Sequence, residues 1–135
     1  MTLYILDTNT VSVALRGAAG LDERLQRLDP AQWCISAVTR AELRYGVALK
    51  PGATKLSQYV DAFLRSTTTA PWDQAAADAH GLLRAKLRRA GTPIGDFDEM
   101  IAAHALALEA TLVTDNTRHF QMVDGLALEN WVRNN

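Results

Sequence analysis

Three short apolar runs constrain the fold of this chain more than any other feature of its sequence. They span Leu3–Leu6, Cys34–Ser36 and Thr111–Thr114. An unbroken apolar run of this length is typical of a strand that is buried on both faces of a parallel sheet. Between the runs, apolar residues recur every three to four positions, which is the period of an amphipathic helix. Because parallel strands need crossover connections, this alternation predicts an α/β sandwich with a central parallel sheet.

The helical pattern is clearest in the second half of the chain. The longest helix is predicted from about Asp73 to Ala90, with Gly91 as its C-terminal stop. A further helix is predicted to begin near Asp98. In a sheet of this kind a functional cleft forms outside the carboxyl ends of the strands, so polar residues at those ends are the first candidates for a site.

Composition limits the class of protein. The chain has 135 residues, with ordinary apolar and charged contents of 48% and 21%, which predicts a single domain over residues 1–135. Its formal net charge of -1 excludes a chain-wide attraction to nucleic acid, so any such role must come from local sites. The only cysteine, Cys34, is interpreted as a small buried residue. No signal-peptide or membrane-spanning pattern occurs at the N-terminus, which favours a cytoplasmic location.

Acidic residues stand at the boundaries of the predicted elements. Asp7 follows the first strand, Glu42 lies shortly after the second, and Asp98 begins the helix before the third. Each has a structural alternative. Asp7 could cap the next helix, and Glu42 could close a capping box with Thr39. Asp98 could be an ordinary first-turn acid, which the helix dipole stabilises.

These acids are expected at the same edge of the sheet. Carboxylates that converge repel one another unless a positive charge compensates them, and Mg²⁺ or Mn²⁺ prefers such oxygen ligands. Asp115 and Asn116 follow the last strong strand and could ligate the ion or orient its water, although an Asx-type turn explains them as well. A carboxylate-bound cation suggests phosphodiester hydrolysis by an activated water.

The sequence resembles the PIN-domain nucleases, and among them the VapC-type toxins of bacterial toxin-antitoxin pairs. The resemblance covers nearly the whole chain and is carried by four ordered motifs. They are residues 5–9 (Ile-Leu-Asp-Thr-Asn), residues 35–46 with Ala-Glu-Leu-Arg-Tyr-Gly at their end, residues 94–105 from Ile-Gly-Asp-Phe-Asp to Ala-Ala-His-Ala, and residues 112–120 (Leu-Val-Thr-Asp-Asn-Thr-Arg-His-Phe). It implies a PIN-like α/β/α sandwich and a Mg²⁺- or Mn²⁺-dependent endoribonuclease that leaves a 5′-phosphate and a 3′-hydroxyl.

The resemblance also assigns site residues. The catalytic and metal-binding positions of the family correspond to Asp7, Glu42 and Asp98 in this sequence. Asp96 stands where relatives are often uncharged and is a weaker candidate ligand. The fourth acidic position of many PIN domains falls on Asn116, with Asp115 one residue earlier. Thr8, Asn9 and Thr114 resemble the polar residues that brace the acidic pocket.

Partners follow from the same resemblance. The family pairs with a small VapB-type antitoxin, implying a homodimer that forms a hetero-oligomer with it. Tyr45, Tyr59 and Phe63 are candidate groove residues, with ordinary core packing as their alternative.

Contacts to an RNA substrate, such as a structured tRNA, must come from local charge. The candidates are Arg84, Lys86, Arg88, Arg89, Arg118 and His119. A cationic helix C-terminus and a polar surface loop are the structural alternatives. His80 and His104 are interpreted as structural residues.

Two other functions compete with this interpretation. A haloacid-dehalogenase-like phosphatase also places an aspartate after its first strand, but it needs a second Asp where Asn9 stands. A PIN fold without catalysis, kept as an RNA- or protein-binding module, is the other alternative. The presence of Asp7, Glu42 and Asp98 together argues against it, because an idle site is free to lose a costly acidic cluster.

Overall fold

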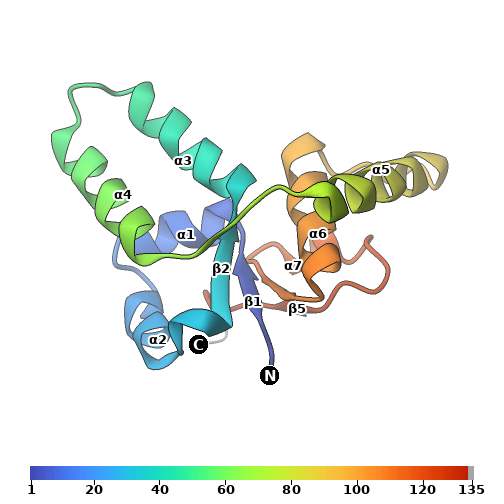
Figure 1. Ribbon diagram of the computed structural model, residues 1–135, viewed down its shortest axis with the longest axis horizontal. Coiled ribbons are helices and arrows are strands. Elements are labelled where there is room, and N and C mark those ends of the chain that lie inside the picture. The colour runs from blue at the N-terminus through green and yellow to red at the C-terminus, as the bar shows by residue number, and fades with distance from the viewer. Residues whose placement is uncertain (134–135) are drawn as a thin grey trace.

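A computed structural model describes residues 1–133 of the chain. Within this range five strands form one parallel sheet in the order β3-β2-β1-β4-β5. The strands are β1 (Tyr4–Leu6), β2 (Trp33–Ser36), β3 (Thr69–Ala70), β4 (Thr111–Val113) and β5 (Leu128–Glu129). The three strands expected from the apolar runs are the three central ones, and helices cover both faces of the sheet (Figure 1). The predicted α/β sandwich with a central parallel sheet is confirmed.

The described helices connect the strands as crossovers. They are α1 (Thr8–Leu15), α2 (Leu21–Arg27), the short 3₁₀ helix η1 (Pro30–Gln32), α3 (Ala37–Ala48), α4 (Thr54–Ser66), α5 (Gln74–Arg89), α6 (Asp96–Leu108) and α7 (Thr117–Phe120). The prediction for the longest helix is confirmed, because Asp73 and Ala90 are the caps of α5. Helix α6 begins two residues earlier than expected, directly after Gly95. None of the helices described is long and apolar enough to cross a membrane.

The central strands bury both of their faces. Along β1, Ile5 belongs to the apolar cluster on one face and Leu6 to the cluster on the other, and in β4 Leu112 and Val113 divide in the same way. Successive side chains of a strand point to opposite faces, so an unbroken apolar run supplies two cores at once. Cys34 is buried in the first cluster, as predicted.

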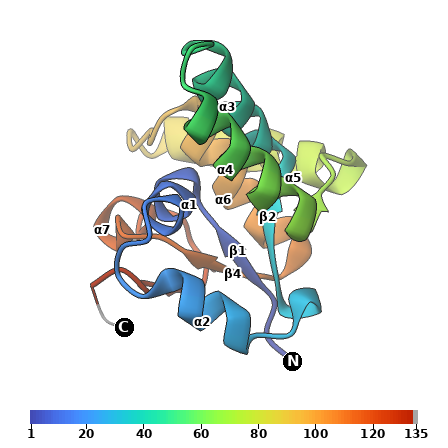
Figure 2. The same cartoon turned by 90° about the vertical axis from the view of Figure 1, so that its left-hand side faces the viewer.

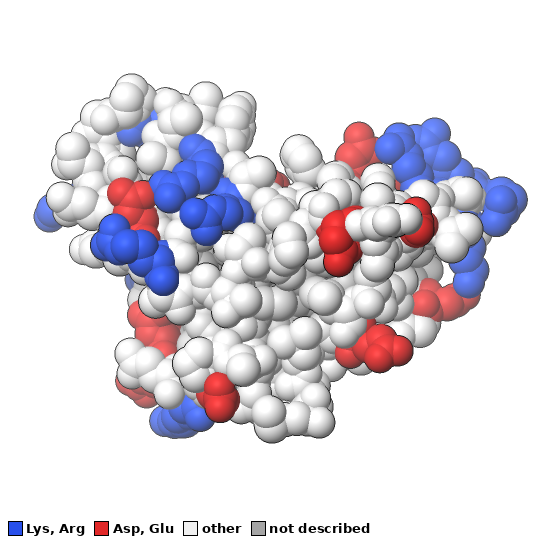
Figure 3. Space-filling view, in the orientation of Figure 1, with Lys and Arg blue, Asp and Glu red and all other residues white. Residues whose placement is uncertain are grey.

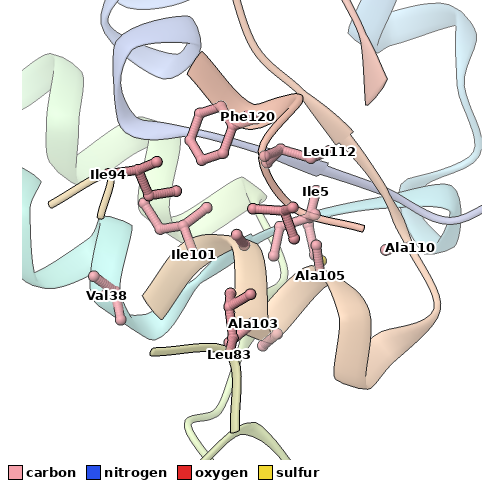
Figure 4. Close-up of a cluster of buried hydrophobic side chains, with 14 of the residues drawn as sticks. Ile5, Val38, Leu83, Ile94, Ile101, Ala103, Ala105, Ala110, Leu112 and Phe120 are labelled. Carbon is pink, nitrogen blue, oxygen red and sulfur yellow. The ribbon is translucent and has the colours of Figure 1, made fainter. Parts of the chain in front are cut away.

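Small residues bring α6 close to the sheet. Ala102, Ala103 and Ala105 are fully buried, and Figure 4 shows this stretch of α6 beside Ile5 and Leu112. Alanine has no side chain beyond Cβ, so the helix axis can approach the strands closely. The position of α6 therefore fixes where its first turn lies relative to the carboxyl ends of the strands.

The opposite face carries α1, α2 and a hairpin formed by α3 and α4, which stands away from the sheet (Figures 1 and 2). Arg44 on α3 forms an ion pair with Asp61 on α4 across this hairpin. Phe63 at the base of α4 packs against Trp33 of β2, with ring centroids 6.1 Å apart. Leu43 of α3 and Val60 and Leu64 of α4 are also buried in the apolar cluster on this face, so both helices of the hairpin are anchored to the body.

Candidate active site

The order in which strands are added to the sheet changes side at β1. The chain moves from β1 to β2 and β3 on one side, and it crosses to β4 and β5 on the other. Such a switch in strand order leaves a crevice outside the carboxyl ends of the two strands at which it occurs. Here those ends are joined directly, because Leu6 pairs with Val113 and the Asp7 backbone N–H donates to the Val113 carbonyl at 3.0 Å. Asp7 and Thr114 are the residues that follow.

Asp7 is a buried carboxylate, with only 4% of its surface exposed. Its Oδ1 accepts a hydrogen bond of 2.9 Å from the Thr10 backbone N–H, so the predicted capping role is confirmed. Burial raises the pKa of Asp7 above its usual 3.8; hydrogen bonds from Thr114 and Thr10 oppose this shift, and the negative charge of nearby Asp98 adds to it. Among the described residues no cation forms an ion pair with Asp7, so its charge is poorly compensated.

Asp98 is the second carboxylate of the pair. It lies in the first turn of α6, which follows Gly95, whose positive φ of 102° favours glycine. The acidic first turn is thus confirmed as a structural feature. The Asp98 side chain is 43% exposed and its Oδ2 lies 3.0 Å from Nε2 of His119. Asp98 is therefore open to a ligand, it contacts His119, and its charge acts on Asp7.

Glu42 is held on a neighbouring element. Helix α3 is capped by Ser36, whose Oγ accepts from the Val38 backbone N–H at 3.0 Å, so the capping box between Thr39 and Glu42 is wrong. Glu42 Oε1 instead accepts a hydrogen bond of 2.7 Å from the Thr8 hydroxyl. This bond ties the half-buried Glu42 to the residue next to Asp7.

The segment after β4 turns tightly. The Asn116 backbone N–H donates to Thr114 Oγ1 at 3.0 Å, so the turn is stabilised by a threonine and the expected Asx-type turn is wrong. Asp115 Oδ1 accepts from Asn130 Nδ2 at 3.0 Å and from Arg133 Nε at 2.7 Å. These hydrogen bonds, the one from Asn130 first, lower the pKa of Asp115. Asp115 is therefore engaged by the C-terminal segment.

A polar pocket of about 380 Å³ lies beside this turn. It contains Asn9, which sequence reasoning placed among the bracing residues, together with Asn116 and Asp115. Arg16 and Arg133 also line it. Arg16 was not among the predicted residues, since a single arginine at the end of an eight-residue helix carries no distinguishing pattern in the sequence.

The predicted ligands do not form one cluster. Within residues 1–133 no group of three or more His, Cys, Asp or Glu side chains is arranged to hold a metal ion. Asp96 is drawn toward α5, where Arg84 lies 3.7 Å from it, and Asp115 is paired with Arg133. The arginines compensate these two acids, which leaves Asp7 and Asp98 as the pair near the switch point.

This pair fits a hard divalent cation. Mg²⁺ keeps several waters and is commonly bound through one or two carboxylates, and both side chains offer oxygen ligands. A cation would also offset the cost that raises the pKa of Asp7. Glu42 and Asn116 lie on the elements flanking the pair and would supply further oxygen atoms near such an ion.

The candidate substrate contacts fall into two groups. Figure 3 shows Lys and Arg side chains gathered at the C-terminal end of α5, where Lys86, Arg88 and Arg89 occupy the last turn. Lys86 is paired with Asp124 at 3.1 Å, and Arg84 with Asp96. No ion pair is found for Arg88 or Arg89 among the described residues, so these two carry the uncompensated charge.

The second group lies next to Asp98. A pocket of about 430 Å³ is lined by Asn116, Arg118 and His119 together with apolar surface from Ile94 and Met122. His119 also contacts Asp98, so one side chain separates this pocket from the carboxylates. His119 lines this pocket, as a substrate contact would, but its Nε2 is already engaged by Asp98 and by the Ile94 carbonyl.

A large groove runs between α1 and the α3–α4 hairpin. Its volume is about 1140 Å³, and its lining includes Glu42, Tyr59 and Phe63. Tyr45 does not line it and is exposed on α3. Core packing, the alternative for these aromatic residues, applies to the inner side of Phe63 but not to Tyr59, which is 60% exposed.

The two helical histidines have structural contacts. His104 is buried, and its Nδ1 lies 2.8 Å from Ser36 Oγ. His80 and His104 both approach the ring of Trp72, at 5.8 and 5.3 Å. Sequence reasoning did not single out Trp72, because an isolated aromatic residue gives no sign of its partners.

Comparison with known proteins agrees with this architecture. The model of the PIN domain family matches residues 4–126. The chain is 37% identical to the tRNA(fMet)-specific endonuclease VapC of Shigella flexneri over 97% of its own length and 99% of that protein. It is 34% identical to ribonuclease VapC2 of Rickettsia felis, over 96% of this chain and 98% of that one.

Solved structures give the same result. A chain in the crystal structure of DNA-bound VapBC from Salmonella typhimurium superimposes with a TM-score of 0.90 and 34% identity, covering 97% of this chain and 99% of that one. VapBC2 from Rickettsia felis, bound to a promoter DNA fragment, gives a TM-score of 0.88 at 32% identity over 96% and 99%. The strand order, the carboxylates at the switch point and these matches over nearly the whole length together assign the chain to the VapC family of PIN-domain proteins.

Proposed function

We propose that the chain is a metal-dependent endoribonuclease toxin that hydrolyses phosphodiester bonds in RNA. The observation that carries the proposal is the buried, uncompensated Asp7 beside Asp98 at the switch point of the sheet. Membership of the VapC family, whose relatives are named ribonucleases and endonucleases, supports it. The alternative, a PIN fold without catalysis, explains each acid separately, Asp7 as a helix cap and Asp98 as a first-turn residue, but not the negative charge that the two place close together.

Asp7 and Asp98 would hold Mg²⁺ or Mn²⁺, assisted by Glu42 and Asn116. When bound, such an ion supplies a water of lowered pKa and neutralises charge on the phosphate oxygens. Asp7 contributes a fixed oxygen, because Thr10 and Thr114 hold its carboxylate. Thr8 directs Glu42 in the same way, which would let Glu42 orient or accept a proton from the attacking water.

The substrate would approach along the pocket beside Asp98. Arg118 offers a cation for phosphate, and the apolar surface of Ile94 and Met122 suits an unpaired base. Arg88 and Arg89 would add a second contact at the end of α5 if the RNA is long. We propose a structured RNA such as tRNA as the substrate, because tRNA is named for the relative from Shigella flexneri, and we propose the cytoplasm as the location of the activity.

The large groove would bind a VapB-type antitoxin. Tyr59, Phe63 and Val60 give it an apolar lining, and Glu42 also lines it, so an apolar segment that carries a cation would be complementary to it. The similar chains of known structure come from VapBC complexes, which supports this partner. We propose a homodimeric toxin that joins its antitoxin in a hetero-oligomer. Tyr59→Ala should weaken antitoxin binding, and Tyr45→Ala, outside the groove, is the matched control.

The test is cleavage of total cellular RNA by the purified, antitoxin-free chain with Mg²⁺, Mn²⁺ or EDTA, with mapping of new 5′ ends. Discrete cuts that need metal and disappear in Asp7→Asn and in Asp98→Asn are expected. Asp96→Asn should retain activity, because that residue is paired with Arg84. A folded protein that binds Mn²⁺ but cuts no cellular RNA would contradict the nuclease and favour a binding module.

A further inference from the structure

We infer that His119 is a positioning residue for Asp98, rather than a contact to the substrate. The inference rests on the proposed metal site, because it concerns how Asp98 is held for a cation. His119 lies in α7 and is separated by 21 residues from Asp98 in sequence, yet Nε2 of the ring lies 3.0 Å from Asp98 Oδ2. The same nitrogen lies 2.8 Å from the Ile94 carbonyl oxygen.

These two contacts determine where the ring carries its hydrogen. A carbonyl oxygen can only accept a hydrogen bond, and so can an ionised carboxylate. Nε2 must therefore be the protonated nitrogen, and its hydrogen is shared between Ile94 and Asp98. The fixed tautomer gives the ring a defined orientation, with one edge directed at the start of α6.

The backbone before α6 is held from two sides. The Ile94 N–H donates to Glu99 Oε2 at 3.2 Å, and Glu99 is 98% buried, since only 2% of its surface is exposed. The Ile94 carbonyl accepts from His119. Gly95 then takes a positive φ, and the helix begins. Because His119 binds both Ile94 and Asp98, it couples the carboxylate to the segment that determines where α6 starts.

The His119 ring packs against a buried neighbour. Phe120, the next residue, is buried in the core, and its ring lies 5.3 Å from that of His119 in an edge-to-face arrangement. A carboxylate whose Oδ2 is held by such a donor leaves Oδ1 for a ligand, since no hydrogen bond to Asp98 Oδ1 is found among the described residues. Partners of this kind orient metal-binding side chains, and their removal typically weakens metal affinity about 10- to 100-fold.

A positioning role and a substrate contact predict different changes on substitution. His119→Phe keeps an aromatic ring against Phe120 but has no donor, whereas His119→Gln keeps an N–H. If His119 positions Asp98, the Phe variant binds Mn²⁺ about 10- to 100-fold more weakly, and the Gln variant recovers part of the loss. In RNA cleavage the Phe variant then loses kcat with little change in KM; a substrate contact would raise KM instead.

The experiment is a titration of the purified full chain with Mn²⁺, followed by electron paramagnetic resonance, for wild type, His119→Phe, His119→Gln and Asp98→Asn. The double variant His119→Phe/Asp98→Asn should bind no more weakly than Asp98→Asn alone, because His119 acts through that carboxylate. Arg118→Ala, one residue away, should keep the Mn²⁺ affinity of the wild type.

A folded His119→Phe variant with wild-type Mn²⁺ affinity would overturn the inference. It would also be overturned if His119→Phe weakened Mn²⁺ binding equally in the wild type and in Asp98→Asn. Should that variant fail to fold, nitrogen NMR of the metal-free wild type decides, since an Nδ1–H tautomer would be incompatible with the two contacts. The Mn²⁺ titration does not depend on RNA, so this inference can stand or fall separately from the nuclease activity.

Discussion

Thr8 and Glu42 are joined by a hydrogen bond of 2.7 Å, although 34 residues separate them in the sequence. The Thr8 hydroxyl has one hydrogen, which Glu42 accepts. Thr39 Oγ1 lies 3.0 Å from Thr8 Oγ1, so Thr39 must be the donor in that second contact. The result is a directed chain of hydrogen bonds from Thr39 through Thr8 to the carboxylate.

Thr8→Val should lower RNA cleavage more than Thr39→Val does. The first substitution removes the donor to Glu42, and a hydrogen bond to a charged group contributes about 1.5–3 kcal/mol, equivalent to roughly a 10- to 100-fold change in rate. The second removes only the donor to Thr8. Cleavage kinetics of the two variants, with Thr8→Ser as the control that keeps a hydroxyl, check this order. Equal activity in Thr8→Val and wild type would remove the bond from the mechanism.

Asp7→Asn should stabilise the metal-free protein at neutral pH while abolishing RNA cleavage. Burial raises the pKa of Asp7, so the folded state holds a proton more tightly than the unfolded state does. The cost of the buried charge is therefore complete above the folded pKa and absent below 3.8. Asn also caps a helix well, so the cap is retained.

Urea unfolding of both proteins from pH 3 to pH 8 in EDTA measures the effect. The difference in unfolding free energy should be largest at neutral pH and should shrink as the pH falls through the raised pKa of Asp7. An advantage for Asp7→Asn that is the same at all pH values would show that the stabilisation does not come from charge.

His104 should make the protein sensitive to acid. Burial lowers the pKa of His104 below 6.5, against the opposing effects of Asp73 and of a hydrogen bond to the Pro71 backbone. The stability that depends on neutral His104 is therefore present above pH 6.5 and is lost as the pH falls through the lowered value. His104→Phe should cost about 1–3 kcal/mol at pH 7.5, because it removes the ring nitrogen that Ser36 Oγ contacts inside the core, and it should flatten this part of the stability curve. An unchanged slope between pH 4 and pH 7 in that variant would rule out His104 as the cause.

Cys34 should not react with thiol reagents while the protein is folded. Burial raises the pKa of its thiol to about 11, so the thiolate that reacts is scarce at neutral pH, and the sulfur lies within the core. A disulfide reagent such as Ellman's should titrate one thiol in urea and none in buffer at pH 7.5. Rapid reaction of the native protein would show that the core around β2 opens.

The central strands were predictable because an unbroken apolar run is by itself enough to indicate a buried strand. Ile5 and Leu6, like Leu112 and Val113, are apolar in succession, which is expected only when both faces of a strand are covered. The edge strands β3 and β5 have two residues each, and so short a segment has no periodicity to detect.

The site was predictable only in part. Asp7, Glu42 and Asp98 were found from their positions at element boundaries, and the capping role of Asp7 from its place before a helix. The sequence could not predict that Arg84 pairs with Asp96 or that Arg133 pairs with Asp115. Each pair joins segments whose distance in space depends on how complete helices pack. The link between Asp98 and His119 has the same origin, since it requires α6 and α7 to meet above the sheet.

The sheet order also determines when the site can form during synthesis. β1 is made before the other four described strands, and it is the central strand of the finished sheet, so it needs β2 on one side and β4 on the other. Asp7 is made early, whereas Asp98 and the end of β4 are made late. A nascent chain therefore carries its first carboxylate on an unpaired strand until most of the polypeptide has emerged. An RNA-cutting site that needs both Asp7 and Asp98 would therefore assemble only late in the synthesis of the chain.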